Sequence, residues 1–388
     1  MLVDEGGAVL GALAPFAVET PWWQDLGPVV AGARSRFGAR VVILRLLSAE
    51  RRDPPGVAVT YVAQIEGDPP ALEPWTGTLQ DHLFRLSYAK PGGPAADLAW
   101  ATAALAVRGI GLTGAAQQVR TWNLSSLWRL PTSGGAVWMK VVPPFLAHEG
   151  ALLARLDGEA VPKVLARDGG RLLLAEIPGD DLHGAPPDRL AAMVTLLVDM
   201  QGRWFGQTEA LLDLGLPDRR YGPLTAAIVD VVERTASELT GAERAVLRRF
   251  VAGLPARMAQ IAACGLGDTL VHGDFHPGNL RGEAGGALTL LDWGDSVVGH
   301  PLLDQPAFLD RIDPAHVPAL RDHWIGCWRA AVPGSDPARA ASLLAPAAAA
   351  RQAAVYRGFL DRIEPSEHPY HRADPAERLR RAAALAAS

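Results

Sequence analysis

The sequence predicts an α+β chain in three parts, in which a β-rich segment is followed by a longer helical one. Residues 109–178 contain short runs of β-prone residues separated by Gly- and Pro-rich turns. Residues 179–388 instead carry apolar residues at helical spacing over long segments. Residues 1–108 mix both patterns, so we expect a small α+β cap module ahead of the other two parts.

The first part has four expected elements. They are a helix over 21–36, strands over 41–47 and 57–65, and a helix over 97–107. The turn motif DPPG at 53–56 separates the two strands, which indicates a hairpin. This strand pair and its preceding helix faintly resemble part of a Nudix domain. The acidic Nudix signature is absent, so no hydrolase chemistry is assigned, and a packing or regulatory cap and a ligand-binding module both stay open.

The second part is predicted to be a small sheet. Its expected strands cover 117–121, 125–130, 136–142 and 171–174. The third strand carries Lys140, and nine residues later Glu149 begins a segment with helical periodicity. A lysine near the end of an apolar strand ordinarily extends its amine to the surface. The glutamate at this spacing favours a functional ion pair instead.

The third part is predicted to be helical. The expected helices cover 187–204, a segment after Pro223, a segment from 240 to about 264, and 318–330, 337–354 and 375–387. Thr240 and Glu243 form a capping-box motif that opens the third of these.

Composition limits the classes of partner. The chain has 388 residues, a hydrophobic share of 49% and a charged share of 20%, as globular proteins do. Its net charge of −5 and the lack of a basic tract with interleaved aromatic residues argue against nucleic acid as a partner. No run reaches the roughly 20 apolar residues that span a bilayer.

The two cysteines, Cys264 and Cys327, are far apart and lack metal-ligand spacing. We therefore expect neither a disulfide framework nor zinc, and we expect a cytoplasmic protein. Asp4 and Glu5 stand where a signal peptide would be basic, which agrees. Heavy use of Ala, Arg, Gly and Pro is typical of GC-rich bacterial genomes.

Residues 270–304 carry the strongest motif, LVHGDFHPGNLRGEAGGALTLLDWGDSVVGHPLLD. Two short strands joined by its Gly-rich turn would bring Asp274, Asn279 and Asp292 to one end of a hairpin. Phosphoryl transfer needs such a set. One carboxylate orients and deprotonates the attacking hydroxyl, while an amide oxygen and a second carboxylate hold Mg²⁺ on the nucleotide phosphates.

The spacing in this stretch is that of a kinase catalytic loop, because five residues separate Asp274 from Asn279 and an acidic motif follows. The chain resembles the aminoglycoside phosphotransferase family, the small-molecule branch of the protein-kinase-like fold. The family signature H-G-D-x-H-x-x-N followed by D-W-x-D is matched at every fixed position. The resemblance implies a bilobal fold with a β-rich N-lobe and a helical C-lobe, and an enzyme that uses ATP and Mg²⁺.

The resemblance also implies roles for single residues. Asp274 would be the catalytic base, with His272 in the same loop orienting it, and Asn279 and Asp292 would be metal ligands. Asp304 would brace the loop.

On the nucleotide side, Lys140 would hold phosphates, with Glu149 fixing its position. Ser125 and Ser126, in a loop without glycine, are candidate phosphate contacts, and exposed strand-edge serines are an equal alternative. Backbone groups of Glu176 and Ile177 would read the adenine edge.

The acceptor is expected to be a small molecule with a hydroxyl group, such as a sugar, amino sugar or aminoglycoside. Candidate lining residues on the C-terminal helices are Asp304, Asp310, Trp324, Trp328, Tyr356, Asp361 and Glu364. GTP in place of ATP, and a nucleotide-binding pseudokinase with a regulatory role, stay open as alternatives. The short segment between 295 and 303 leaves no room for a long activation segment, which argues against a protein substrate.

Overall fold

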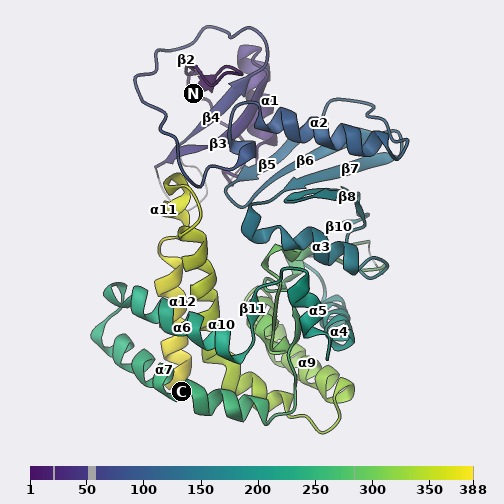
Figure 1. The fold of residues 1–388 in the computed structure, drawn as a ribbon, viewed down its shortest axis with the longest axis vertical. Coiled ribbons are helices and arrows are strands. Elements are labelled where there is room, and N and C mark those ends of the chain that lie inside the picture. The colour runs from purple at the N-terminus through teal and green to yellow at the C-terminus, as the bar shows by residue number, and fades with distance from the viewer. Residues whose placement is uncertain (21, 51–57, 284, 388) are drawn as a thin grey trace. The chain divides into compact units, whose positions relative to one another are not determined.

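The computed structural model describes residues 1–20, 22–50, 58–283 and 285–387. The chain divides into two compact units. Unit 1 comprises residues 1–150, 163–176 and 359–372, and unit 2 comprises residues 151–162, 177–358 and 373–388. Figure 1 shows the fold and labels many of the elements of both units. A division into three domains at residues 108 and 178 stays a prediction, although the two sheets of unit 1 lie on either side of residue 108.

The first sheet of unit 1 has four strands in the order β2-β1-β4-β3. They are β1 (Leu2–Val3), β2 (Val9–Gly11), β3 (Val41–Ala49) and β4 (Val59–Ile65). The predicted pairing of β3 with β4 is confirmed, and it is antiparallel. The turn motif at 53–56 lies outside the described residues.

Helix α1 (Gly27–Phe37) covers this sheet and shares a core with it through Val29 and Ala33. The sequence predicted that this helix starts at residue 21. That start is wrong, because residues 22–26 are described and are not helical, and the helix begins at Gly27. The backbone N–H of Leu26 is instead donated to Val119 O of the second sheet, at 2.9 Å. The residues just before the helix therefore make a strand-like contact with the second sheet and do not extend the helix.

The second sheet of unit 1 has five antiparallel strands in the order β5-β6-β7-β9-β8. They are β5 (Gln117–Trp122), β6 (Ser125–Thr132), β7 (Gly135–Val141), β8 (Val164–Asp168) and β9 (Arg171–Ala175). Four of these were predicted, within one or two residues at most ends. Strand β8 was not, because its polar residues interrupt the alternation.

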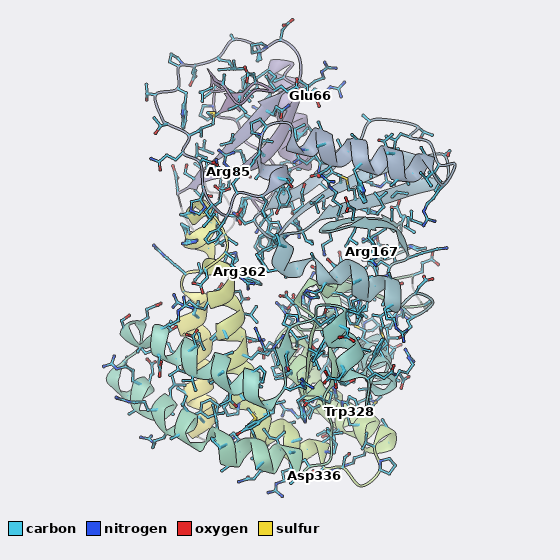
Figure 2. The ribbon with its side chains drawn as sticks, in the orientation of Figure 1. Glu66, Arg85, Arg167, Trp328, Asp336 and Arg362 are labelled. Carbon is cyan, nitrogen blue, oxygen red and sulfur yellow. The ribbon has the colours of Figure 1, made fainter. Side chains whose placement is uncertain are left out.

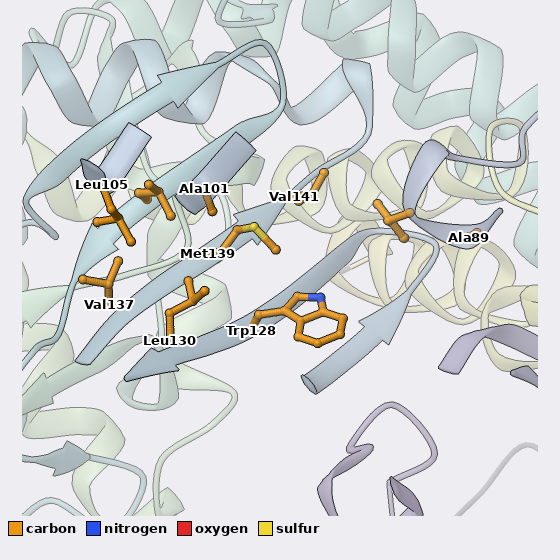
Figure 3. Close-up of a cluster of buried hydrophobic side chains, with 10 residues drawn as sticks. Ala89, Ala101, Leu105, Trp128, Leu130, Val137, Met139 and Val141 are labelled. Carbon is orange, nitrogen blue, oxygen red and sulfur yellow. The ribbon is translucent and has the colours of Figure 1, made fainter. Parts of the chain in front are cut away.

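A single apolar core joins this sheet to helix α2 (Gly93–Ala106). Leu105 and Ala101 of α2 pack among Trp128 and Leu130 of β6 and Met139 of β7, and Figure 3 shows this cluster. Helix α2 was assigned to the cap module from its position in the sequence. In the structure it covers the second sheet, since its buried residues lie against β6, β7 and β9.

The side chain of Gln118 links the two sheets directly. The amide of buried Gln118 in β5 accepts a hydrogen bond from Ile43 N and donates one to Ile43 O of β3, at 2.9 and 2.7 Å. This side chain thus satisfies both backbone groups of an edge residue, as a neighbouring strand would.

A segment from near the C-terminus completes unit 1. Residues 359–372 include the short helix α11 (His368–His371). Arg85 pairs with Glu364 of this segment at 2.8 Å, and both side chains are largely buried. Arg85 and Arg362 are labelled in Figure 2, on the two segments that this ion pair joins. The predicted division had placed this segment in the helical C-lobe.

Unit 2 is mainly helical. Its long helices are α4 (Pro187–Arg203), α6 (Tyr221–Arg234), α7 (Gly241–Ala262), α9 (Val317–Ala331), α10 (Pro337–Leu360, up to residue 358) and α12 (Asp374–Ala387). All were predicted, and the predicted capping box at Thr240 is present. Helix α4 packs on α9, and α12 packs on α7 (Figure 1). Within the described residues, no helix has both the length and the apolar composition needed to cross a bilayer.

Two small three-stranded sheets frame the motif at 270–304. One has the order β10-β13-β14, from Asp180–Asp181, Leu280–Gly282 and Thr289–Leu290. The other has the order β11-β15-β12, from Asp218–Arg219, Val297–Gly299 and Thr269–Val271. Strand β12, which leads into His272, therefore pairs with β15, while β13 and β14 form the hairpin inside the motif.

Candidate active site

The β13–β14 hairpin brings the two predicted metal ligands to one end. Leu280 pairs with Leu290 in the antiparallel ladder, and Leu291 N donates to Asn279 O at 2.8 Å. Asn279 immediately precedes β13, and Asp292 follows β14 by two residues. The predicted hairpin is therefore present, and its geometry places these two side chains at the same edge.

Asp292 has an unusual backbone conformation. Its φ of 58° and ψ of 62° lie in the left-handed region, and it is the one non-glycine residue with positive φ in the described part of the chain. Aspartate tolerates this region better than most residues, yet the conformation costs roughly 1 kcal/mol or more. Strain of this kind concentrates at functional sites, where surrounding contacts hold it.

Asp304 holds the loop that carries Asp274. Its side chain is fully buried, and its carboxylate accepts hydrogen bonds from the backbone N–H of Gly273 (2.7 Å), the backbone N–H of His272 (2.9 Å) and Nε2 of Gln201 (2.9 Å). Burial raises the pKa of this carboxyl, and the nearby His272 and the two N–H groups act against that rise. The expected bracing contact is thus present in the structure.

Gly273 is required by its place in this loop. Its φ is 91°, and a Cβ there would collide with the carbonyl oxygen of Asp295. A side chain at this position would push the loop away from the residues that follow the hairpin.

His272 is buried and hydrogen bonded at both ring nitrogens. Nε2 lies 2.7 Å from Leu291 O, and Nδ1 accepts the backbone N–H of Asp274 at 3.3 Å. Burial lowers its pKa, so the ring is neutral and donates from Nε2. The ring also meets Trp293 edge-on, with centroids 4.7 Å apart. These contacts fit the expected role of orienting the loop and leave no ring nitrogen for proton transfer.

The carboxylate of Asp274 is partly exposed and is flanked by two cationic or donor groups. Arg311 Nη1 lies 3.0 Å from Oδ1, and His276 Nε2 lies 3.4 Å from Oδ2. Burial alone would raise the pKa of Asp274. The hydrogen bond from His276 and the charge of Arg311 outweigh burial and hold the pKa well below its usual range. The group is therefore an anion at any physiological pH.

The side-chain amide of Asn279 is held by the loop that carries Asp274. Its Nδ2 donates to the backbone carbonyl of Asp274 at 2.9 Å, and no hydrogen bond to its Oδ1 is found among the described residues. An amide oxygen and the Asp292 carboxylate are hard donors suited to Mg²⁺. No group of three or more His, Cys, Asp or Glu side chains that could hold a metal occurs in the described part of the chain. Two protein ligands fit Mg²⁺, which usually completes its shell with phosphates and water.

Sequence reasoning missed two arginines near Asp274. Arg311 is the first. The second is Arg351 of α10, whose side chain is buried and whose Nη1 lies 3.4 Å from Gly273 O. In the described part of the chain its Nε and Nη2 have no hydrogen-bond partner. Burial lowers its pKa, while the charges of Asp304, Asp295 and Asp274 oppose that change. The signal in the sequence was that Arg351 is the one charged residue in the Ala-rich tract 345–354.

In unit 1, Lys140 and Glu149 form the predicted ion pair. Lys140 Nζ of β7 lies 2.8 Å from Glu149 Oε1, and Glu149 is 1% exposed. Glu149 lies near the start of α3 (His148–Arg155). This pair connects a sheet strand to a helix in the way that the kinase resemblance implied.

The turn between β5 and β6 is tied down by the C-terminal segment. The backbone N–H of Asn123 donates to the Glu367 carboxylate at 3.0 and 3.1 Å, and Glu364 N donates to Asn123 Oδ1 at 3.1 Å. Ser126 is 1% exposed and bonds to Thr121 and Trp128, while Ser125 Oγ accepts from Trp122 Nε1. Phosphate contact by either serine stays a prediction, and the exposed-serine alternative does not describe Ser126.

Glu176 and Ile177 follow strand β9, as expected for a hinge. The side chain of Glu176 pairs with Arg129 at 3.2 Å. Ala175 N ends the sheet ladder by donating to Lys163 O at 3.0 Å. Gly179 follows with φ of 84°, close against Gly282, where only glycine fits. Base recognition by this segment stays a prediction.

Several candidate acceptor residues have other roles. Trp324 and Trp328 are fully buried, and Trp324 packs edge-on against Phe275 and Phe308. Asp310 is bound by Arg381, with both distances 2.5 Å. Glu364 belongs to unit 1, as described above. Tyr356 in unit 2 is buried enough that its pKa is raised. The two tryptophans therefore form core and offer no stacking surface.

Comparison with known families decides the class of protein. The match is to the phosphotransferase enzyme family and covers residues 127–325, or 199 of the 388 residues. The chain belongs to this family. The matched range contains Lys140, Glu149 and the whole motif at 270–304, so the phosphotransferase match and the geometry involve the same residues. The family resemblance seen in the sequence is confirmed.

Solved structures confirm the kinase-like α+β fold of the phosphotransferase family. The macrolide 2'-phosphotransferase of Brachybacterium faecium is 18% identical, with a TM-score of 0.52 over 74% of this chain and 97% of that one. Choline kinase of Streptococcus pneumoniae is 14% identical, with a TM-score of 0.52 over 76% and 99%. A choline/ethanolamine kinase family protein of Mesorhizobium loti is 18% identical, with a TM-score of 0.51 over 74% of this chain and 94% of that one. None of the curated proteins matches the chain significantly.

Proposed function

We propose that this phosphotransferase is an ATP-dependent, Mg²⁺-requiring kinase that acts on a hydroxyl group of a small molecule. The acceptor class is a sugar, amino sugar, aminoglycoside or related antibiotic or metabolite. The observation that carries the proposal is the loop in which Asp274 is kept anionic beside Asn279. The buried Asp304 carboxylate fixes this loop by accepting hydrogen bonds from its backbone. Macrolide phosphotransferases and choline kinases among the similar structures support a small acceptor.

In this proposal Asp274 accepts the hydrogen bond of the acceptor hydroxyl and orients its oxygen toward the terminal phosphorus. The new O–P bond forms as the bond from that phosphorus to the bridging oxygen breaks, and ADP leaves. The hydroxyl proton passes to Asp274. Because its pKa is low, Asp274 acts chiefly by orientation and takes the proton late, when the oxygen has become acidic.

Asn279 Oδ1 and the Asp292 carboxylate would hold Mg²⁺, which neutralises phosphate charge when bound. Lys140 would contribute a second positive charge to the phosphates, and Glu149 would keep its amine in place. His272 keeps the loop rigid through its two ring hydrogen bonds. Preorganisation of these groups is the main source of rate in phosphoryl transfer, since the protein itself makes no covalent bond.

A cytoplasmic and bacterial setting is part of the proposal. Both cysteines of the chain are free thiols, as a reducing compartment favours.

The test is an ATP-consumption screen with Mg²⁺ against aminoglycosides, macrolides, neutral and amino sugars, choline and homoserine. Asp274→Asn should abolish turnover with any acceptor that scores, and ATP affinity should stay near the wild-type value. Asp199→Asn on the exposed side of α4 is the matched control and should remain active. ATP binding with no turnover across the panel would favour the pseudokinase alternative. Parallel reactions with GTP show which of the two nucleotides the enzyme uses.

A further inference from the structure

The last peptide group before Asp274 is held by a residue far along the chain. Arg351 of α10 donates from Nη1 to Gly273 O at 3.4 Å. The N–H of the same peptide group belongs to Asp274, and it donates to His272 Nδ1 at 3.3 Å. Both polar ends of this peptide group are therefore bonded to side chains, and Arg351 supplies one of the two bonds.

The two preceding peptide groups depend on a different side chain. The N–H groups of His272 and Gly273 donate to the Asp304 carboxylate at 2.9 and 2.7 Å. Asp304 thus fixes the loop as far as the nitrogen of Gly273. Rotation of the next peptide plane would swing the side chain of Asp274, because the plane includes the Asp274 nitrogen and α-carbon. Arg351 therefore holds the step that follows those bonded to Asp304.

The guanidinium of Arg351 also packs closely against Gly273. Arg351 is 2% exposed. A Cβ on Gly273 would lie 3.1 Å from Nη2 of Arg351 and would collide with Asp295 O. The guanidinium therefore lies on the side of Gly273 from which a side chain would project, and it limits movement of the loop in that direction.

Packing alone does not account for a charged residue at this position. Many neighbours of Arg351 in α10 are buried alanines, and an apolar side chain would fill the same space without desolvation of a charge. In the described part of the chain, the bond to Gly273 O is the one hydrogen bond of this side chain. The carboxylates of Asp304, Asp295 and Asp274 act on it through their charge. The cation thus lies close to the acidic groups in and around the loop.

We propose that Arg351 is a positioning residue for the phosphoryl transfer, in that it fixes the peptide group between Gly273 and Asp274 and so aims the Asp274 carboxylate at the acceptor hydroxyl. The inference rests on the proposed function, because it uses the role given there to Asp274. Arg351 acts through Asp274 and needs no contact with the acceptor or the nucleotide. A small displacement of a reacting group lowers the rate of such a step even when the substrates still bind.

The first experiment measures hydrogen–deuterium exchange in the full chain without nucleotide or acceptor. Arg351→Met keeps an unbranched side chain and removes the charge and the donors. Backbone amides of residues 270–276 should exchange about tenfold faster or more, while those of α7 should keep wild-type rates. Arg339→Met, at an exposed position of the same helix, is the matched control and should change neither segment.

Unchanged exchange at residues 270–276 in Arg351→Met would overturn the proposal, whatever reaction the protein catalyses. Faster exchange throughout unit 2 would also overturn it, because Arg351 would then stabilise the fold as a whole. If Arg351→Met does not fold, Arg351→Lys decides alone, by its exchange at residues 270–276 and by its kcat.

The second experiment measures steady-state turnover with an acceptor from the screen. Arg351→Met should lower kcat about tenfold or more and leave the KM for ATP within about twofold of the wild type. Arg351→Lys restores a cation without the planar fork and should recover part of the loss. Asp304→Asn acts on the same loop, so the double variant should lose less than the product of the two single losses.

Equal losses of kcat in the lysine and methionine variants would overturn the role of the cation. A fully multiplicative double variant would show that Arg351 and Asp304 do not act on the same loop, and it would also overturn the proposal. If the wild type turns over no acceptor, the proposed function fails, and the exchange experiment still decides whether Arg351 holds the loop.

Discussion

Asp304 Oδ1 accepts a 2.7 Å hydrogen bond from the backbone N–H of Gly273, the residue that precedes Asp274. The second oxygen of the same carboxylate accepts the N–H of His272. One buried side chain from beyond the hairpin thus fixes two successive peptide groups, and the position of Asp274 depends on it.

Asp304→Asn should lower kcat by about a hundredfold, because the new amide would face backbone N–H donors and displace the loop by a fraction of an ångström. It should also lower the free energy of unfolding by about 1–3 kcal/mol. Steady-state kinetics and urea unfolding measure the two effects. Asp322→Asn, at an exposed position of α9, is the matched control. Wild-type kcat in Asp304→Asn would remove Asp304 from its positioning role.

Arg311→Met should move the acid limb of the pH profile upward. The wild-type pKa of Asp274 is held low, so activity should persist down to acidic pH without loss from this group. Burial raises the pKa of Asp274, and the Arg311 charge counteracts that effect. Without this charge the pKa of Asp274 rises, so the loss of kcat/KM on acidification should begin at a higher pH. A profile with an unchanged acid limb would mean that the 3.0 Å pair does not govern the ionisation of Asp274. Arg321→Met, exposed on α9, serves as control.

Asp292→Asn and Asp292→Ala separate backbone conformation from metal binding. Both should lose turnover by a factor of about a hundred or more and should show a raised Mg²⁺ requirement. Only the alanine should also lose about 1 kcal/mol of stability, since asparagine tolerates the left-handed region and alanine does not. Equal stabilities of the two variants would show that the strain is not specific to the side chain. Turnover is followed against Mg²⁺ concentration, and stability is followed by denaturant titration.

Lys140→Ala should raise the KM for ATP about tenfold or more and lower kcat, because the phosphates lose a fixed positive charge. Glu149→Gln should act in the same direction with a smaller effect, since the lysine remains but is less constrained. Lys90→Ala, at an exposed position of unit 1, is the control. Normal nucleotide kinetics in both variants would end the assignment of this pair.

Glu367→Gln should flatten the dependence of stability on pH. Burial raises the pKa of Glu367 to about 8, against the hydrogen bond from Asn123, whereas the unfolded value is near 4.5. Between these values the folded chain binds a proton that the unfolded chain lacks, so wild-type stability falls as pH rises from 5 to 8. The variant has no titrating group at this position, so its melting temperature should change less between pH 5 and pH 8. Glu66→Gln, exposed in the same unit, should follow the wild type, and an identical slope in Glu367→Gln would contradict the raised pKa.

The parts that the sequence predicted well are those encoded within short segments. The β13–β14 hairpin, the positions of Asn279 and Asp292 on it, and the capping box at Thr240 each follow from residues fewer than about 20 positions apart. Helices α4, α6 and α7 were predicted for the same reason, because their apolar residues recur with a period of 3.6.

The parts that it missed depend on contacts between distant residues. Arg351 reaches Gly273 across 78 positions, and Gln118 bonds to Ile43 across 75. Nothing in the local pattern around Arg351 or Gln118 marks the partner. The start of α1 was misplaced for a related reason, since Leu26 is held by a strand that lies more than 90 residues further along the chain.

The return of residues 359–372 to unit 1 sets the order in which this protein can mature on the ribosome. Asn123 and Arg85 are synthesised long before Glu367 and Glu364 emerge, so their buried partners are missing during most of translation. The N-terminal half therefore lacks these contacts until almost the whole chain has been synthesised, and its buried polar groups at Asn123 and Arg85 stay without these partners during that interval.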